Sequence, residues 1–358
     1  MEPRKINRIA NALVTWYAAN ARDLPWRRTK DPYAVWISEI MLQQTQVKTV
    51  IPYFDRWMRT LPTIREFAVA SPEKVLKLWE GLGYYSRVRN AQWAARLIMA
   101  QYDGRFPERF DDILELPGIG RYTAGAISSI AFNQPTPILD GNVIRVLTRI
   151  FGVAGDPRGM EVNAKLWDLA TRLVSARKIE PAKLNQSLME LGALICLARQ
   201  PRCAQCPVGQ HCFARREGRI AMFPAATRRT PVTQRRFIAL VVREQDRFLV
   251  RPRAAASVNA GLWEFPNFEI PVKTKNPAAL AAPFETAGGR PFFSVRHSIT
   301  RYRILLEAFY ANKPAETKPD GVWKTLDQMN RLPFTSAHRK VLNAVRGDGR
   351  LTNRDRNA

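Results

Sequence analysis

The spacing of apolar residues changes along this chain, and that change limits the folds the chain can adopt. From about residue 6 to residue 200, apolar side chains recur with the period of an amphipathic helix. Three such stripes are Leu13 with Trp16 and Tyr17, Trp36 with Ile40 and Val47, and Val75 with Leu76 and Trp79. Proline and glycine interrupt the pattern at intervals, so we predict about ten helices joined by short loops.

From Phe237 onward the pattern indicates strands instead. The segment FIALVVREQDRFLVRPR predicts two strands around a turn at Glu244–Asp246, and LWEFPNF and YRILLEAFY predict more. A last helix is expected over Thr335–Val345. We therefore predict a mainly α protein in four parts: a helical domain at 1–213, a basic linker at 214–236, an α+β domain at 237–345 and a basic tail at 346–358.

The charge of the chain indicates a polyanionic partner. Lys and Arg number 56 against 31 Asp and Glu, a net charge of +25, which favours nucleic acid, with a membrane surface as the alternative. The longest uncharged run, Tyr122–Leu139, holds two prolines and several polar residues and would not span a bilayer. The N-terminus lacks the apolar core of a signal peptide. We expect a soluble protein of a bacterial-type cytoplasm, held near the nucleoid by DNA.

All four cysteines lie within 17 residues, at Cys196, Cys203, Cys206 and Cys212. A disulfide framework would spread its cysteines across the fold to close long loops. Four thiols this close together indicate a metal site. Their spacing fits a [4Fe–4S] cluster and leaves a zinc site open as the alternative.

A glycine-rich turn separates two predicted helices at Leu116-Pro-Gly-Ile-Gly-Arg-Tyr122. Gly118 and Gly120 allow backbone amides to face outward at the start of a helix, where the helix dipole favours an anion. The arrangement is typical of a helix–hairpin–helix that binds a DNA phosphate. The alternative is a plain helix–helix turn capped by glycine.

Two acids are candidates for catalysis. Glu39 is a lone acid in an apolar helical segment, and Asp140 follows the hairpin at the expected start of another helix. The alternatives are a solvent-exposed Glu39 and an Asp140 that only caps its helix. If Glu39 is buried, its pKa rises and it becomes a candidate general acid beside an ionised Asp140. Cleavage of a glycosidic bond requires such a pair.

Flat and polar side chains near basic residues could enter a base stack. Tyr84 and Tyr85 lie between glycines and arginines, and Gln43 and Gln44 follow the Glu39 segment. The alternative for each is an ordinary core tyrosine or an exposed glutamine. The three histidines, His211, His297 and His338, form no metal-binding pair, and we expect them on the surface or in loops.

Taken together, these motifs resemble the MutY family of adenine DNA glycosylases, within the endonuclease III superfamily. The resemblance covers about residues 6–215 and rests on Leu24-Pro-Trp-Arg27, Ser38–Gln46, Gly81–Tyr85, the hairpin, Leu139–Val143 and the cysteines. It implies a monomer that removes adenine paired with 8-oxoguanine from double-stranded DNA. It also implies a six-helix lobe at about 28–134 and an iron–sulfur lobe formed by about 1–27 and 135–213.

The resemblance implies roles for single residues. Glu39 would protonate the adenine ring at N7, and Asp140 would stabilise the oxocarbenium-like sugar. The residues expected to support these two carboxylates are Tyr122 and Asn142. The residues expected around the adenine or in the base stack are Trp26, Arg27, Gln186, Gln44 and Tyr84. The four cysteines would hold one [4Fe–4S] cluster.

Tyr122 distinguishes among relatives of this family. Endonuclease III-type lyases carry a lysine there that forms a Schiff base with the sugar, and tyrosine cannot. The resemblance therefore implies a glycosylase that leaves an abasic site. Open alternatives are a thymine glycosylase for G:T mismatches, an endonuclease III-like glycosylase, a DNA-binding protein without catalysis and a zinc-stabilised structural protein.

The C-terminal domain resembles the MutT-like recognition domain of the same family, through Leu262-Trp-Glu-Phe-Pro266. The glutamate-rich Nudix box is absent from the sequence, so we expect no pyrophosphatase activity. The family reads 8-oxoguanine with a Phe-Ser-His loop. Here Ile299 and Thr300 take the first two positions, and Arg301 departs from the family's histidine.

Overall fold

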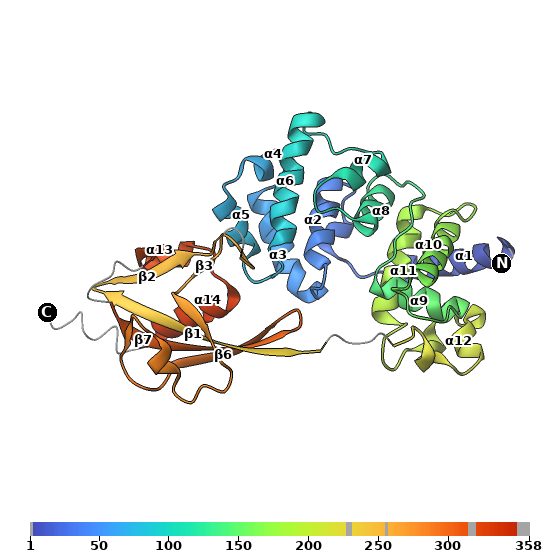
Figure 1. The fold of residues 1–358 in the computed structure, drawn as a ribbon. Coiled ribbons are helices and arrows are strands. Elements are labelled where there is room, and N and C mark those ends of the chain that lie inside the picture. The colour runs from blue at the N-terminus through green and yellow to red at the C-terminus, as the bar shows by residue number, and fades with distance from the viewer. Residues whose placement is uncertain (1–2, 227–230, 255–256, 314–319, 349–358) are drawn as a thin grey trace. The chain divides into compact units, whose positions relative to one another are not determined.

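The computed structural model describes residues 3–226, 231–254, 257–313 and 320–348 (Figure 1). The chain forms two compact units. The helical unit comprises Met1–Val69 and Arg89–Arg228, and the sheet unit comprises Ala70–Val88 and Arg229–Ala358. Most of the basic tail predicted at 346–358 lies outside the described residues. Within the described residues, no helix combines the length and apolar character needed to cross a bilayer.

The predicted run of helices is confirmed. The helices of this region are α1 (Pro3–Asn20), α2 (Pro32–Leu42), α3 (Val47–Thr60), α4 (Ile64–Val69), α5 (Pro72–Trp79), α6 (Ser86–Gln101), α7 (Phe110–Glu115), α8 (Arg121–Ile130), α9 (Gly141–Phe151), α10 (Met160–Val174) and α11 (Pro181–Leu194), and the short α12 (Phe213–Arg216) follows beyond the predicted run. Proline starts several of them, because its fixed φ suits the first helical turn and the amide it lacks would have no partner there.

One predicted stripe is wrong. Trp36 and Ile40 lie in α2, whereas Val47 begins α3. Between them the chain turns, with Gln44 in the left-handed region at a φ of 57°. A residue in this conformation cannot continue a right-handed helix. The turn allows α3 to pack beside α2 and leaves residues 43–46 as a loop.

Close contact between α9 and α11 depends on one glycine. A Cβ atom at Gly192 of α11 would lie 2.6 Å from the Cβ atom of Asn142 in α9. Only a residue without a side chain fits there. The two helices therefore approach closely where α9 begins, which is the end of α9 that carries Asp140 as its N-cap.

The strands of the described part of the sheet unit are β1 (Thr233–Glu244), β2 (Arg247–Pro252), β3 (Trp263–Glu264), β4 (Asn267–Ile270), β5 (Glu285–Thr286), β6 (Phe293–Ile299), β7 (Tyr302–Asn312) and β8 (Val322–Thr325). The segments predicted as strands form β1, β2, β3, β4 and β7, whereas β5, β6 and β8 were not predicted. The order along the main path is β3-β2-β1-β7-β5, while β4 pairs with β1, β6 with β7 and β8 with β2. The central pair, β1 and β7, is parallel.

Both faces of this sheet are buried, which explains the continuous apolar run in β1. Val241 faces a core that Val341 and Leu342 of α14 (Ser336–Gly347) help to form. Its neighbours Leu240 and Val242 face a second core on the other side. Successive strand residues point to opposite faces, so a strand covered on both sides must be apolar at every position. The last predicted helix is confirmed as α14, which follows the shorter α13 (Leu326–Arg331).

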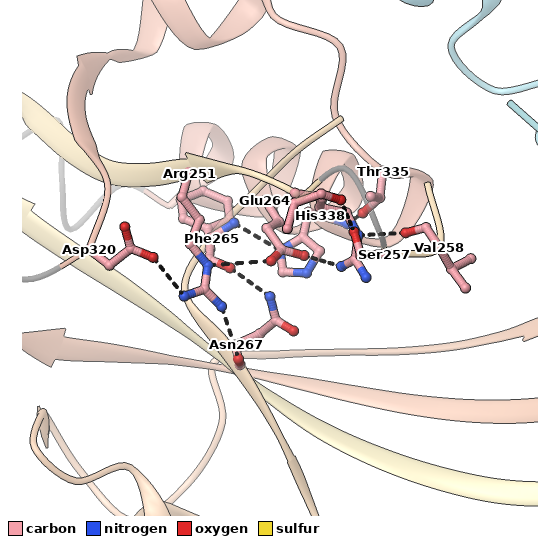
Figure 2. A network of polar contacts seen from close by, with 11 residues as sticks. Arg251, Ser257, Val258, Glu264, Phe265, Asn267, Asp320, Thr335 and His338 are labelled. Carbon is pink, nitrogen blue, oxygen red and sulfur yellow. Dashed lines mark hydrogen bonds and ion pairs between the residues drawn. The ribbon is translucent and has the colours of Figure 1, made fainter. Parts of the chain in front are cut away.

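A polar network joins β2 and β3 to α14 (Figure 2). The buried carboxylate of Glu264 pairs with Arg251 and Arg253. His338 of α14 accepts a hydrogen bond from the backbone amide of Phe265 at 3.1 Å, and burial lowers the pKa of its ring to about 3. The expectation that His338 lies on the surface is therefore wrong: it is a neutral core residue.

Candidate active site

A cavity of about 620 Å³ opens inside the helical unit and is large enough to admit a nucleobase. Its walls come from the segment before α2, from α2 itself, from the starts of α8 and α9, and from α11. It brings together most of the residues singled out in the helical part of the sequence. They are Trp26, Arg27, Glu39, Gln43, Gln44, Gly120, Tyr122, Asp140, Asn142 and Gln186.

Glu39 lies on α2 at this cavity and is only 4% exposed, so the solvent-exposed alternative is wrong. Burial raises the pKa of its carboxyl to about 7, and the negative charge of Asp140 acts in the same direction. The hydroxyl of Tyr122 donates a hydrogen bond to Glu39 Oε2 at 2.7 Å, which together with Arg27 opposes part of that rise. A carboxyl in this state can hold a proton near neutral pH.

Asp140 is the N-cap of α9, as its alternative interpretation predicted, and it also faces the cavity. Its Oδ1 accepts a hydrogen bond from the amide of Val143 at 2.8 Å, and its Oδ2 accepts one from Asn142 Nδ2 at 3.1 Å. Burial raises the pKa of Asp140, and these hydrogen bonds oppose the rise. The carboxylate is thus held in a fixed orientation.

Arg145 links the Asp140 end of α9 to the cysteine loop. Its guanidinium donates to Asn142 Oδ1 at 2.8 Å and to the carbonyl of Cys196 at 2.7 Å. A third bond, at 2.8 Å, goes to the carbonyl of Gly192 at the point of closest helix approach. Asn142 is therefore fixed from one side by Arg145 while it donates to Asp140 from the other.

A second buried glutamate, Glu190 of α11, lines the same cavity, and the sequence interpretation missed it. Its carboxylate accepts hydrogen bonds from Arg22 at 2.7 Å and from Arg27 at 2.9 Å. Burial would raise its pKa, but the two arginines outweigh burial and hold the pKa at about 2. The available signal was the same as for Glu39, an acid within an apolar helical stretch.

Three predicted adenine-binding residues form one wall. Trp26 is buried and packs edge-on against Phe54, with ring centroids 5.4 Å apart. Arg27 lies over the ring of Tyr17 at 5.4 Å, and the hydroxyl of Tyr17 donates to Gln186 Oε1 at 3.0 Å. The wall therefore offers a flat ring, a charged donor and an amide.

The hairpin has the expected geometry. Gly118 has a φ of 77°, and a Cβ atom there would lie 2.6 Å from the Cβ atom of Asn90. Gly120 is the N-cap of α8 and has open space where a side chain would be. Backbone amides at the start of α8 are thus uncovered on one side, as anion binding requires.

Three predicted DNA-contacting residues lie in the sheet unit. Tyr84 is 42% exposed and adopts a left-handed φ of 46°. Ile299 is the last residue of β6, and Thr300, with a φ of 48°, follows it in the turn that leads to β7. Tyr84 and Thr300 therefore lie in tight turns, and Ile299 lies beside one.

The four cysteines line one smaller cavity together with apolar side chains and Arg149. Arg149 Nη1 lies 3.4 Å from Cys196 Sγ, and the thiol of Cys212 lies 3.4 Å from the carbonyl oxygen of Arg149. Within the described part of the chain, no three His, Cys, Asp or Glu side chains converge closely enough to hold a single metal ion. All four thiols nevertheless face a common space.

The chain is similar to proteins of known activity over most of its length. Residues 37–172 match the family of HhH-GPD superfamily base excision DNA repair proteins, and residues 237–344 match the NUDIX domain. The adenine DNA glycosylase of Rattus norvegicus is 36% identical over 396 residues, which cover 92% of this chain and 76% of that protein. The adenine DNA glycosylase of Buchnera aphidicola subsp. Schizaphis graminum (strain Sg) is 37% identical over 341 residues, covering 92% and 96%.

A solved structure of a thermostable thymine-DNA glycosylase is similar to the helical part. It superposes with a TM-score of 0.54 at 30% sequence identity and covers 60% of this chain and 98% of that one. These similarities confirm the predicted combination of a helix–hairpin–helix glycosylase fold with a C-terminal MutT-like domain.

Proposed function

The chain belongs to the adenine DNA glycosylases of the HhH-GPD superfamily and is a base-excision repair enzyme that acts on N-glycosyl bonds; on that premise we propose that it removes adenine paired with 8-oxoguanine from double-stranded DNA. One observation carries the proposal: Glu39, Tyr122 and Asp140 meet at one cavity that is large enough for a nucleobase. The adenine must leave the base stack to reach them.

In the proposed reaction Glu39 is the general acid. Its protonated carboxyl transfers a proton to N7 of the adenine ring, which makes the base a better leaving group. The bond between the base and C1′ of the sugar then breaks, and its electron pair stays with the adenine. A water molecule adds to C1′ and returns a proton to the Glu39 carboxylate.

Asp140 is proposed to stabilise the positive charge that develops on the sugar. Its oxygens are already oriented by the amide of Val143 and by Asn142, so little reorganisation is needed when the charge appears. Tyr122 supports Glu39 and offers no amine to the sugar. We therefore propose a product with an abasic site and an intact strand.

Trp26, Arg27 and Gln186 are proposed to bind the extruded adenine, since they line the cavity beside Glu39. Gly118 and Gly120 are proposed to bind a DNA phosphate through the start of α8. Gln44 and Tyr84 are proposed to fill the base stack, and Ile299 and Thr300 to read 8-oxoguanine opposite the adenine. The net charge of +25 supports binding to the phosphates of DNA. The protein is also proposed to act as a monomer, in a bacterial-type cytoplasm.

Cys196, Cys203, Cys206 and Cys212 are proposed to hold one [4Fe–4S] cluster. Four thiols around a common space are the donor set that such a cluster takes. When bound, the cluster supplies a rigid cross-link for the loop that it joins. The loop in turn fixes Arg145 through the carbonyl of Cys196. Iron and sulfide analysis and the visible absorbance spectrum of the purified protein separate this proposal from a zinc site: we expect a brown protein that contains both elements, and zinc without iron would contradict the cluster.

A panel of duplexes tests the proposed function. Single-turnover cleavage is measured after alkali on duplexes with adenine opposite 8-oxoguanine or guanine, and on a G:T mismatch. We expect adenine release, fastest opposite 8-oxoguanine, and strand breaks only after alkali. Faster thymine release from G:T would favour the activity named for the similar solved structure. Strand cleavage without alkali would contradict a product with an intact strand.

A further inference from the structure

The segment 70–88, which follows α4, is tied to the C-terminal sheet. It falls in the same compact unit as residues 229–358. Segment 70–88 contains α5 and the glycine-rich loop that carries Tyr84. The same unit also carries the turn with Ile299 and Thr300. The proposed wedge and the proposed lesion reader therefore belong to one body.

The connection is a half-buried charge cluster around Glu80, which follows α5 directly. Glu80 Oε1 accepts hydrogen bonds from Arg339 Nε of α14 at 2.7 Å and from the amide of Phe334 at 3.1 Å. Glu80 Oε2 accepts from Arg339 Nη2 at 3.2 Å and from Lys77 at 2.7 Å. The side chains of Glu80 and Arg339 are only 13% and 19% exposed, so solvent screens the pair weakly.

The partners of Glu80 are themselves fixed. Arg339 Nη2 and Lys77 both donate to the carbonyl of Leu332, at 2.6 Å and 3.1 Å. The backbone amide of Trp263 in β3 donates to the carbonyl of Pro333 at 2.7 Å. Residues 332–334, which contact Glu80, Lys77 and Arg339, are thus hydrogen-bonded to β3, and α5 ends beside them.

The loop after Glu80 is held internally, so its tip follows its base. The indole of Trp79 donates to the carbonyl of Gly83 at 3.0 Å, and the hydroxyl of Tyr85 accepts from the amide of Gly81 at 3.2 Å. Arg87 donates to the carbonyls of Leu82 and Gly83 at 3.2 Å and 3.1 Å. These bonds fix the backbone of residues 81–83, directly before Tyr84.

We propose that Glu80 and Arg339 are positioning residues that hold Tyr84 in register with the lesion-reading turn. The Glu80–Arg339 pair fixes the base of the loop to α14, and the loop transmits that position to Tyr84. This inference rests on the proposed function for the role of Tyr84 in DNA. The Glu80–Arg339 pair, called the clamp below, exists whatever Tyr84 does in DNA. In the proposed function the clamp couples Tyr84 to the domain that would distinguish 8-oxoguanine from guanine.

Hydrogen exchange tests the clamp without any DNA. We expect Arg339→Met to speed exchange of the Gly81 and Leu82 amides by about tenfold, with α8 unchanged. The matched control is Arg346→Met, which removes the same charge from α14 where Arg346 contacts Asn330 at an exposed site. Arg339→Lys, which keeps a donor, restores part of the protection. Equal exchange in both Met variants would overturn the clamp.

The coupling is tested on DNA. We expect Arg339→Met to lower the ratio of adenine excision opposite 8-oxoguanine to that opposite guanine by about tenfold, since small misplacements carry large penalties. In the complex of this variant with DNA, the fluorescence of a 2-aminopurine placed beside the lesion should show a matching change in base stacking relative to the wild-type complex. Faster exchange with an unchanged ratio would overturn the coupling. If the whole protein excised no adenine, the proposed function would fail, while the exchange result would still decide the clamp. Should Arg339→Met unfold, Glu80→Gln, which keeps an acceptor for the Phe334 amide, takes its place.

Discussion

Two glutamates line the same cavity and have opposite properties. Glu39 and Glu190 are both almost fully buried, at 4% and 0% exposed. Two arginines contact Glu190 and hold its pKa at about 2, whereas Glu39 has a tyrosine hydroxyl as its partner and a pKa of about 7. Burial is common to both, so the neighbouring groups decide which glutamate is a permanent anion and which can carry a proton.

The two sides of the cavity therefore have different roles. The Glu190 side is a structural ion cluster that fixes Arg22 and Arg27. The Glu39 side holds an acid beside Asp140. We therefore expect a change at Glu39 to affect the rate of base excision and a change at Glu190 to affect the stability of the fold first.

Glu39→Gln should produce the largest effect. The amide cannot deliver a proton, so single-turnover excision of adenine should fall by about a thousandfold or more. DNA binding, measured by fluorescence anisotropy, should stay within about twofold. Asp55→Asn, which changes an exposed acid on α3, is the matched control and should leave both quantities unchanged. Excision by Glu39→Gln at the wild-type rate would remove Glu39 from the role of acid.

Glu190→Gln should lower the free energy of unfolding by about 3 kcal/mol at pH 7, because Arg22 and Arg27 lose their anion. The pKa of Glu190 is lowered in the folded protein, so its contribution is present above about pH 4.5 and is lost as the pH falls towards 2. The difference from wild type in urea unfolding should therefore shrink over that range.

The control for Glu190→Gln is Glu180→Gln, which breaks an exposed pair with Lys183. Its effect should stay below about 1 kcal/mol. An equal loss in both variants would show that the buried cluster contributes no more than a surface pair.

Tyr122→Phe should give the smallest effect, a shift in the pH dependence of the excision rate. Excision uses protonated Glu39, so the wild-type rate should fall as the pH rises through about 7. The Tyr122 hydroxyl favours the carboxylate form, so its removal raises the pKa of Glu39. The falling limb should move to higher pH by about one unit. A limb that stays in place would mean that another group controls it.

Local sequence patterns predicted most of the elements, and they failed where distant contacts decide. The paired strands before and after Glu244–Asp246 followed from alternation and turn residues. The break between Trp36 and Val47 did not, since Gln-Gln-Thr-Gln contains no glycine or proline to mark it. His338 was misplaced because its partner, the amide of Phe265, lies 73 residues away.

The candidate site shows the same limit. Glu39, Tyr122 and Asp140 could be named from motifs, but the burial that raises the pKa of Glu39 arises from packing among α2, α8 and α11. Glu190 carries the same local signal as Glu39, but its pairing with Arg22 and Arg27, more than 160 residues away, could not be predicted from the local pattern. Glu80 was missed for the same reason, since Arg339 lies 259 residues further along the chain.

Because Asp140 is the N-cap of α9, a substitution there can remove its negative charge while the shape of the side chain stays almost the same. Asparagine caps helices about as well as aspartate, and its oxygen could still accept from the Val143 amide. Asp140→Asn would thus preserve this capping bond while deleting the negative charge and the oxygen that accepts from Asn142. We therefore expect this isosteric variant to fold correctly, to bind its duplex and to leave the base attached. Such a protein is suited to trapping the intact complex.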